Sequence, residues 1–262
     1  MEYLNKYKLN NKKILVAGGL GLIGKEITNA CLDLGADVTI IDKEKILKKN
    51  KFKTKLEYKS MDLSNRGGLK KFEDFILSKN YDVFINSMYL KDKYWERHSF
   101  DNFNISSFSK NIEINSFGIF LSSNLIAENM KKKKIKGSII LLNSIYGLVG
   151  QDMSIYKNSS IKENKVYSIL KGGLSNYVRQ MASYYGKYKI RVNSICPGGI
   201  MDKNSQKLKK NKSFINAYIN KVPLKRFGLP QDVASLSGFL SSDASSYITG
   251  QNIPLDGGWT SI

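Results

Sequence analysis

Cysteine, histidine and long apolar runs are scarce in this chain of 262 residues. The two cysteines, Cys31 and Cys196, are far apart and form no CxxC pair, and there is a single histidine. These features argue against a disulfide framework and a metal site, so we expect no metal and a reducing, cytoplasmic compartment. Before the first glycines, the N-terminus carries an apolar run of only about five residues, too short for a signal-peptide core or a membrane span.

Acidic residues are also few, with 22 Asp and Glu against 42 Lys and Arg and a formal net charge of +20. Such a charge is typical of nucleic-acid-binding proteins. However, the lysines are spread along the whole chain, and the densest run, KKKKIK at 131–136, ends a predicted helix, where cations interact favourably with the helix dipole. We interpret the charge as a composition bias with no nucleic-acid partner. Its field would still attract anionic substrates such as sugar phosphates.

Short apolar runs alternate with helix-length segments along the chain, without a repeat, a linker or a change in composition. Most runs are nearly continuous in apolar residues, as in parallel strands covered on both faces. The runs are KKILVAGG, ADVTIID, LEYKSMD, YDVFINS, GSIILLNS, IRVNSICPGG and QNIPLDGG, and helices are predicted over 22–34, 66–79, 101–133 and 165–187. This order predicts a Rossmann-type α/β fold, with a doubly wound, mostly parallel seven-stranded sheet and helices on both faces, formed by residues 1–262 as one domain.

The first predicted strand leads directly into a glycine-rich turn, and a helix follows. Glycine permits a tight turn, a close approach of backbone N–H groups to a pyrophosphate, and close packing of the helix on the strand. Asp42 ends the second strand eighteen residues after Gly24, where a carboxylate can accept hydrogen bonds from ribose hydroxyls. The pattern predicts a dinucleotide site with Gly18, Gly19, Gly21, Leu22, Ile23 and Gly24.

The same segment bears on the choice between NAD and NADP. The Asp42 carboxylate would repel the 2′-phosphate of NADP, and no Lys or Arg lies between Gly18 and Gly24 to bind one. Both features favour NAD. Lys43 and Lys45 weaken this preference, so NADP remains the less favoured alternative.

From this turn onward the chain resembles the short-chain dehydrogenase/reductase family over almost its full length. Later motifs follow in the family's order: MDLS, VFINSMY, NIEINSFGIF, LLNSIYG, PGGI, VPLKRFGLPQDVA (222–234) and ITGQNIPLDGGW (248–259). The resemblance implies that Asp62 and Leu63 lie at the adenine of the cofactor. It also implies that Pro197, Gly198 and Ile200 lie at the nicotinamide.

The resemblance also implies roles for residues at the other strand ends. Asn86 supports the fourth strand beside the cofactor, and Asn115 and Ser144 belong to a catalytic tetrad. Three departures from the family pattern stand out: SMY (87–89) replaces the end of an NNAG motif, Asp202 replaces a threonine, and the glycine spacing is similar to that of the extended branch.

Two tyrosines compete for the role of catalytic acid. Tyr156 lies twelve residues after Ser144, close to the usual interval, but Ser160 stands where a partner lysine is needed and turn residues follow. Tyr167 is followed four residues later by Lys171, so both side chains lie on one helix face. A nearby ammonium would lower a phenol pKa of about 10 toward neutrality. We therefore predict Tyr167 and Lys171 as the catalytic pair.

Choosing Tyr167 leaves about ten extra residues between it and Ser144, and this insertion, about 148–165, is predicted to border the substrate pocket. A passive surface loop or an oligomer contact is an equally good interpretation. Candidate substrate contacts are Tyr94, Trp95, Tyr146 and Tyr156. The neighbouring His98 is interpreted as a surface residue, and a lid is predicted at about 201–220.

The insertion and the SIYG motif are similar to those of flagellin-modification oxidoreductases. This likeness implies an NAD-dependent enzyme that transfers a hydride to or from a carbinol carbon of a sugar, sugar phosphate or nucleotide sugar in surface-glycan or nonulosonic-acid synthesis. Family resemblance also implies a homo-oligomer, a tetramer or a dimer. Three alternatives remain: a nucleotide-sugar epimerase or dehydratase, a non-catalytic cofactor-binding protein, and an RNA-binding protein.

Overall fold

Seven parallel strands form one sheet in the part of the chain that the computed structural model describes, residues 2–44, 55–157, 159–201 and 211–262. Their order is β3-β2-β1-β4-β5-β6-β7, and every neighbouring pair is parallel. The strands are β1 (Lys13–Ala17), β2 (Asp37–Asp42), β3 (Leu56–Ser60), β4 (Val83–Asn86), β5 (Ser138–Leu142), β6 (Arg191–Pro197) and β7 (Asn252–Leu255). The predicted α/β fold is confirmed, and the sheet is fully rather than mostly parallel.

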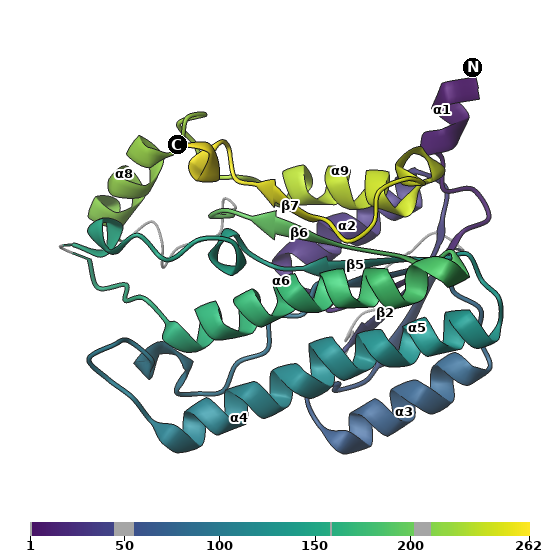
Figure 1. The fold of residues 1–262 in the computed structure, drawn as a ribbon, viewed down its shortest axis with the longest axis horizontal. Helices are drawn as coiled ribbons and strands as arrows, with labels where there is room; N and C mark the ends of the chain where they lie inside the picture. Colours follow the sequence, from purple (N-terminus) through teal and green to yellow (C-terminus); the bar gives the residue numbers. More distant parts are fainter. Residues whose placement is uncertain (1, 45–54, 158, 202–210) are drawn as a thin grey trace.

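Helices cover both faces of this sheet (Figure 1). The α-helices are α1 (Glu2–Tyr7), α2 (Leu22–Asp33), α3 (Arg66–Leu77), α4 (Ile105–Asn115), α5 (Ser122–Lys132), α6 (Lys165–Tyr185), α8 (Lys212–Lys221) and α9 (Pro230–Ser241). Helices α2 and α9 pack on one face, and α3, α5 and α6 pack on the other.

The core follows from the alternation of side chains along each strand. In β1, Leu15 and Ala17 pack with α3, α5 and α6, whereas Ile14 and Val16 pack with α2 and α9. Because successive strand residues point to opposite faces, a strand covered on both sides has to be apolar throughout. All four of these side chains are fully buried, which explains the continuous apolar runs in the sequence.

The helix predicted over 101–133 differs most from its expected form. It begins at Ile105, where the Asn104 side chain accepts a hydrogen bond from the Ser107 N–H at 2.7 Å. A π-helical turn, Ser116–Leu121, then separates α4 from α5. Such turns are rare and are frequent at functional sites, and this one follows Asn115 directly.

Helix α6 begins at Lys165, its predicted start, and ends at Tyr185, two residues before its predicted end. The Asn164 side chain caps it by accepting a hydrogen bond from the Tyr167 N–H at 3.0 Å. Tyr167 is therefore in the first turn of a helix of 21 residues, whereas Tyr156 ends a short 3₁₀ turn, Met153–Tyr156. Both outcomes agree with the sequence-based choice between the two tyrosines.

Some expectations concern residues outside the described ranges. They are Lys45, Asp202 and residues 202–210 of the predicted lid. Most of the C-terminal half of the predicted lid, 201–220, belongs to α8. This helix lies beyond the carboxyl ends of the strands (Figure 1). No helix within the described ranges is long and apolar enough to cross a membrane.

Candidate active site

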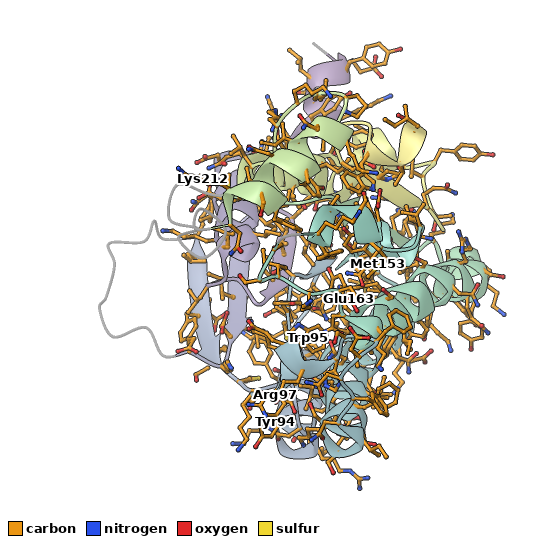
Figure 2. All side chains as sticks on the ribbon, turned by 90° about the vertical axis from the view of Figure 1, so that its left-hand side faces the viewer. Tyr94, Trp95, Arg97, Met153, Glu163 and Lys212 are labelled. Atoms are coloured by element: carbon orange, nitrogen blue, oxygen red, sulfur yellow. The ribbon has the colours of Figure 1, made fainter. Side chains whose placement is uncertain are left out.

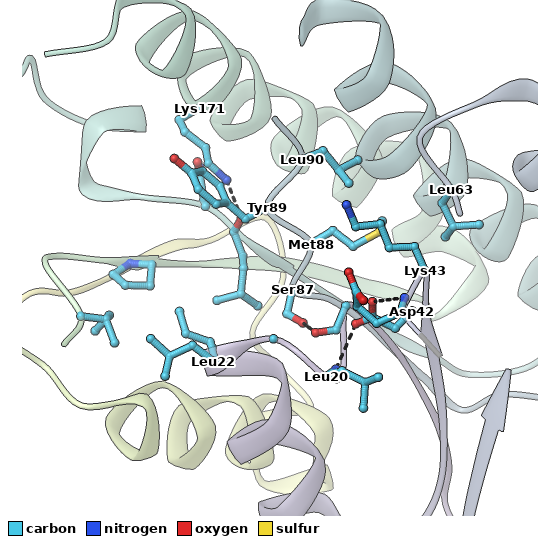
Figure 3. A pocket seen from close by; sticks show the side chains of 18 of the residues that line it. Leu20, Leu22, Asp42, Lys43, Leu63, Ser87, Met88, Tyr89, Leu90 and Lys171 are labelled. Atoms are coloured by element: carbon cyan, nitrogen blue, oxygen red, sulfur yellow. Dashed lines mark hydrogen bonds between the residues drawn. The ribbon is translucent and has the colours of Figure 1, made fainter. Parts of the chain in front are cut away.

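A cavity of about 620 Å³ opens at the carboxyl ends of the central strands (Figure 3). Ligands of open parallel sheets bind at this edge, where the strand order reverses between β1 and β4. Many of the predicted cofactor residues line it: Gly18, Gly21, Leu22, Ile23, Asp42, Asp62, Leu63, Tyr167, Lys171, Pro197, Gly198 and Ile200.

The glycine turn needs its glycines for backbone conformation and for space. Gly18 has φ +77°, a left-handed conformation that favours glycine, and a Cβ on it would lie 3.0 Å from the Met88 nitrogen. A Cβ on Gly24 would lie 2.1 Å from the Gly18 carbonyl oxygen. Gly19 packs on Ile40 instead of lining the cavity. The N-terminus of α2 thereby faces the cavity, a favourable arrangement for a pyrophosphate.

Two of the acidic residues that line the cavity, Asp42 and Asp62, are fixed by backbone N–H groups. The Asp42 carboxylate accepts hydrogen bonds from Leu20 at 3.1 Å and from Glu44 at 3.2 Å, which keeps it at the end of β2. Asp62 accepts one from Ser64 at 3.0 Å. Burial works to raise the Asp62 pKa, but the hydrogen bonds from Ser64, the charge of Lys43 and a hydrogen bond from Asn65 together hold the pKa below its usual range.

Asn86 supports the end of β4 as expected, although it does not line the cavity. Its Nδ2 donates to the Gly118 carbonyl at 2.9 Å and to the Ser122 hydroxyl at 3.3 Å, and its Oδ1 accepts from the Met88 N–H at 3.2 Å. The side chain therefore connects the strand to the π-helical turn after α4. It also sets the path of the SMY segment that replaces the usual family residues.

Ser144, Tyr167 and Lys171 meet at the end of the cavity. Ser144 follows β5, is 5% exposed, and its hydroxyl hydrogen-bonds to the Tyr167 phenol. The Lys171 Nζ lies 5.6 Å from the centre of the Tyr167 ring and donates to the Leu142 carbonyl at 2.8 Å. The i, i+4 spacing therefore brings the phenol and the ammonium to one place, as the sequence predicts.

The expected effect of Lys171 on Tyr167 is wrong for this structure. Burial raises the pKa of Tyr167, and the hydrogen bond from Ser144 offsets only part of this rise. Burial also lowers the pKa of Lys171 to about 8. The ammonium faces the Leu142 carbonyl, and both groups are shielded from water, so burial is the main cause of both pKa shifts.

Asn115 lies next to this pair. Its Nδ2 donates to the Leu90 carbonyl at 3.1 Å and to the Asn111 carbonyl at 2.8 Å. It lines a small pocket together with Tyr89, Tyr167 and Lys171. The amide thus fixes the segment after β4 against α4, beside the lysine.

The PGGI segment after β6 forms the far wall of the cavity. The Gly198 N–H donates to the Leu255 carbonyl at 3.0 Å, and the Gly199 N–H donates to the Tyr218 hydroxyl. The Tyr218 ring is stacked between Phe227, at 4.5 Å, and Trp259, at 4.6 Å. Helix α8 is thereby joined to the segment expected at the nicotinamide.

Comparison with known proteins matches this chain to an established family. A family model described as enoyl-(acyl carrier protein) reductase matches residues 21–260. The chain belongs to the short-chain dehydrogenase/reductase family. A short-chain dehydrogenase from Leptospira borgpetersenii, crystallised with bound NAD⁺, is 33% identical with a TM-score of 0.84, covering 97% of this chain and 94% of that one.

Two curated members of the family match over nearly their whole length. Post-translational flagellin modification protein A of Campylobacter coli is 28% identical, covering 96% of this chain and 99% of that protein. Glucose 1-dehydrogenase 2 of Bacillus subtilis is 27% identical, covering 96% of each. Like its family, this short-chain dehydrogenase/reductase is an oxidoreductase that uses NAD(P) and acts on a CH–OH group.

Of the predicted substrate residues, Trp95 and Tyr146 lie beside Tyr167. Their ring centres are 6.1 Å and 6.5 Å from the Tyr167 ring, both nearly perpendicular to it. Tyr156 and Tyr146 pack on one apolar cluster, where the Tyr156 ring centre lies 5.7 Å from that of Phe214. The Tyr94 ring instead contacts Lys93 and Arg97. Figure 2 shows Tyr94 and Arg97 farther out than Trp95.

The interpretation of His98 as a surface residue is wrong. Its side chain is fully buried, and its Nε2 lies 2.8 Å from the Ser107 hydroxyl, which donates to Asp92 at 2.7 Å. Burial lowers the His98 pKa, so the ring is neutral near neutral pH. The residues around His98 in the sequence do not predict this burial, because Ser107, which its ring contacts, comes from α4.

The insertion is docked on the rest of the short-chain dehydrogenase/reductase. Ile155 is fully buried in an apolar cluster with Phe214 and Tyr218 of α8. Asp152 forms an ion pair with Lys221. These contacts hold the segment, which includes Tyr156, against the same apolar cluster on which Tyr146 packs.

Several residues that the sequence analysis did not select also shape the site. Tyr89 borders both the large cavity and the small pocket. Gln151 and Asn164 connect the insertion to the start of α6, since the Asn164 N–H donates to the Gln151 Oε1 at 3.1 Å. Only Tyr89 had a signal in the sequence, as the large residue in the substituted motif.

Proposed function

We propose that this protein oxidises a secondary alcohol of a sugar or sugar derivative with NAD, or reduces the matching ketone. One observation carries the proposal: Ser144, Tyr167 and Lys171 meet at one end of the cavity. Asp42 lines the same cavity at the end of β2. One end of the cavity suits an adenosine ribose, and the other suits a reacting carbonyl.

Tyr167 acts as the general acid and base. As a phenol, it protonates the oxygen of a ketone during reduction. As a phenolate, it takes the hydroxyl proton of an alcohol during oxidation. A bound nicotinamide dinucleotide supplies the hydride donor or acceptor. Ser144 donates a hydrogen bond to the same substrate oxygen and stabilises the negative charge that develops there.

Lys171 orients the ribose next to the nicotinamide and supplies positive charge close to Tyr167. Asn115 holds a water molecule between Lys171 and solvent, which lets protons reach the site. This role fits its place beside Lys171 in the small pocket. The remainder of the cofactor would be held by other residues that line the cavity: Asp62, Leu63, Pro197, Gly198 and Ile200.

NAD is the preferred cofactor because of Asp42. Its carboxylate lies in the cavity at the end of β2, where it would accept hydrogen bonds from ribose hydroxyls and repel a 2′-phosphate. Lys43 also lines the cavity and is the residue that works against this preference.

The substrate proposal rests on the insertion and on the relatives. The Campylobacter coli relative is named for flagellin modification, and the Bacillus subtilis relative is named a glucose dehydrogenase. An uncharged or anionic sugar, sugar phosphate or nucleotide sugar of surface-glycan synthesis fits both names and the positive field of the chain. We expect a homo-oligomer, a dimer or a tetramer, which light scattering measures.

Absorbance at the NADH band tests the proposal. The protein is incubated with NAD⁺ and a panel of sugars, sugar phosphates and nucleotide sugars, and separately with NADP⁺. NADH formation from at least one sugar, faster than NADPH formation, is the expected result. Product analysis that shows an inverted or dehydrated sugar without net NADH would instead favour the epimerase or dehydratase alternative. NAD⁺ binding with no change in any sugar would overturn the proposed activity.

A further inference from the structure

A buried polar network outside the acid–base group joins the segment after β4 to α4. It includes His98, the single histidine of the chain, whose side chain is fully buried. The His98 Nε2 lies 2.8 Å from the Ser107 hydroxyl, which donates to the Asp92 carboxylate at 2.7 Å. The Asn111 Nδ2 donates to the same carboxylate at 3.0 Å. Because Asp92 and His98 follow β4 whereas Ser107 and Asn111 belong to α4, the network fastens two parts of the chain together.

The network fixes where the His98 ring carries its proton. The Asp92 carboxylate accepts hydrogen bonds from Ser107, from Asn111 and from the Tyr94 N–H, so it is ionised near neutral pH and cannot donate. The one proton of the Ser107 hydroxyl therefore points at Asp92, and the His98 Nε2 has to supply its own. The His98 Nδ1 is buried without a hydrogen-bond partner among the residues that the structure describes. A proton there would be an unpaired buried donor, so the ring is neutral and protonated on Nε2.

One end of the network reaches Asn115. The Asn111 Oδ1 accepts from the Asp92 N–H at 3.1 Å, and the Asn111 carbonyl accepts from the Asn115 Nδ2 at 2.8 Å. The same Asn115 nitrogen donates to the Leu90 carbonyl at 3.1 Å. The backbone of Leu90 to Asp92 is therefore held on α4 by the same set of bonds that orients the Asn115 amide.

The other end reaches Tyr167 through Trp95. The buried Trp95 ring is perpendicular to the Tyr167 ring, with their centres 6.1 Å apart. Trp95 lies between Asp92 and His98 in the sequence, and the network anchors both of these residues. The two ends of the short segment that carries the indole are thus fixed by buried hydrogen bonds.

Backbone contacts with α6 complete the placement of this segment. The Lys165 N–H donates to the His98 carbonyl at 3.0 Å, and the Asn164 Nδ2 donates to the Trp95 carbonyl at 2.7 Å. Both partners lie at the start of α6, within three residues of Tyr167. The imidazole on one side and the helix start on the other therefore set the position of the indole relative to the phenol.

We propose that His98 is a positioning residue for Tyr167. Its hydrogen bond to Ser107 holds the segment Asp92–His98, and this segment holds Trp95 against the Tyr167 ring. The phenol is thereby kept in the orientation that proton exchange with a substrate oxygen requires. This inference rests on the proposed alcohol oxidation, in which Tyr167 is the acid and base.

Three kinds of variant separate the hydrogen bond from the volume of the ring. His98→Leu fills much of the space of the imidazole but cannot donate to Ser107. His98→Gln keeps an N–H donor at the level of Nε2. Ser107→Ala breaks the link to Asp92 by a smaller change, and it replaces His98→Leu in every comparison if that variant does not fold. Trp95→Leu removes the indole directly.

Ser237→Ala is the matched control. Ser237 is fully buried like His98, and its hydroxyl donates to the Val233 carbonyl at 2.9 Å within α9. This helix packs on the face of the sheet opposite to α6. The variant therefore loses a buried hydrogen bond without touching the segment that carries Trp95.

NMR of the protein without substrate tests the geometry. With ¹⁵N-labelled histidine the chain gives one imidazole, which should be neutral and protonated on Nε2 near neutral pH. An aromatic ring shifts the signals of nuclei close to it, so the ring signals of Tyr167, identified by their loss in Tyr167→Phe, should move in Trp95→Leu. They should move in the same direction in His98→Leu and stay in place in His98→Gln and Ser237→Ala. A proton on Nδ1, or unmoved Tyr167 signals in His98→Leu, would overturn the proposal.

Kinetics with the most active substrate of the panel tests the consequence for the reaction. In His98→Leu and in Ser107→Ala, kcat should fall by about tenfold while KM and NAD⁺ affinity stay within about threefold, because only the acid–base group is displaced. His98→Gln should recover most of the lost kcat, and Ser237→Ala should match the wild type. An equal loss of kcat in Ser237→Ala, or a change in KM alone, would contradict the positioning role.

The two measurements also separate this inference from the proposed activity. A wild-type protein that gives the expected NMR signals but oxidises no alcohol of the panel would contradict the proposed activity and support the placement of Tyr167 by His98. An active wild type whose Tyr167 signals ignore His98→Leu would contradict this inference and leave the proposed activity intact.

Discussion

The glycine turn and the insertion both lie near Tyr167, but they are held in different ways. The turn, Gly18–Gly24, is held by contacts within a few residues and by the two strands beside it, such as the close approach of Gly24 to the Gly18 carbonyl. The insertion is held by side chains from distant segments, including the Asp152–Lys221 ion pair and the burial of Ile155.

This difference separates the two tasks of the enzyme. The glycine turn of the proposed cofactor site depends on backbone geometry, so it tolerates almost no added atom. The substrate part depends on hydrogen bonds between side chains, so single substitutions can change its selectivity while leaving the fold and the cofactor site intact. Each prediction below affects one part and leaves the other as the reference.

Gly24→Ala should have the largest effect on the proposed cofactor site. The added methyl group would lie 2.1 Å from the Gly18 carbonyl oxygen, so the turn has to move. We expect NAD affinity measured by calorimetry to fall by about 100-fold. Gly186→Ala, where a Cβ meets nothing within 4 Å, is the control and should bind NAD normally. An unchanged affinity in Gly24→Ala would show that close packing is not required there.

The pH dependence of the two reaction directions should differ because of Tyr167. Burial raises its pKa, so the phenol stays protonated at neutral pH and the phenolate becomes common only as the pH rises. Oxidation needs the phenolate, and its rate should increase by about tenfold per unit between about pH 6 and 8, where Lys171, whose pKa burial lowers to about 8, still carries its charge. Reduction needs the phenol and should stay nearly constant. A flat oxidation profile would contradict the assigned base.

Asp42→Ser should reduce the preference for NAD. The carboxylate that repels a 2′-phosphate is lost, whereas a hydroxyl can still hydrogen-bond to the ribose. The ratio of kcat/KM for NAD to that for NADP should fall by about tenfold or more. Asp37→Ser, at the opposite end of β2, should leave the ratio unchanged. No change in Asp42→Ser would mean that another residue selects the cofactor.

Asn164→Ala should have the smallest effect, and it should fall on the substrate part. The substitution removes the cap on the Tyr167 N–H and the bond to the Trp95 carbonyl. The free energy of unfolding should fall by about 1 kcal/mol, the usual contribution of such a cap. We also expect kcat/KM for the sugar to fall by about fivefold.

Asn65→Ala provides the control for that prediction. Asn65 caps α3 through the Gly68 N–H at 2.9 Å, so it should lose similar stability without slowing turnover at saturating NAD. Equal rate losses in both variants would show that Asn164 acts only through stability.

Much of the lining of the cavity proposed for the cofactor could be predicted from the sequence. Glycine spacing, the carboxylate at the end of β2 and the order of apolar runs all encode local geometry, and the structure places these residues around one cavity. The spacing of Tyr167 and Lys171 is local for the same reason, since four residues make one helical turn.

The rest could not be read from local patterns, because it depends on contacts between distant segments. The burial of His98 depends on Ser107 of α4, and the hydrogen bonds of Gln151 connect Tyr156 to Asn164 at the start of α6. The pKa of Tyr167 could not be predicted from the sequence either. The i, i+4 spacing predicts that an ammonium lies near the phenol. It does not show that both groups are buried or that the ammonium donates to the Leu142 carbonyl.

The most direct test of the account compares Tyr167→Phe with Tyr156→Phe, using NAD⁺ and the most active substrate of the panel. In Tyr167→Phe, kcat should fall by about 1,000-fold while calorimetry shows NAD binding within about threefold of the wild type. Tyr156→Phe should keep kcat within about tenfold of the wild type. An inactive Tyr156→Phe beside an active Tyr167→Phe would contradict the account.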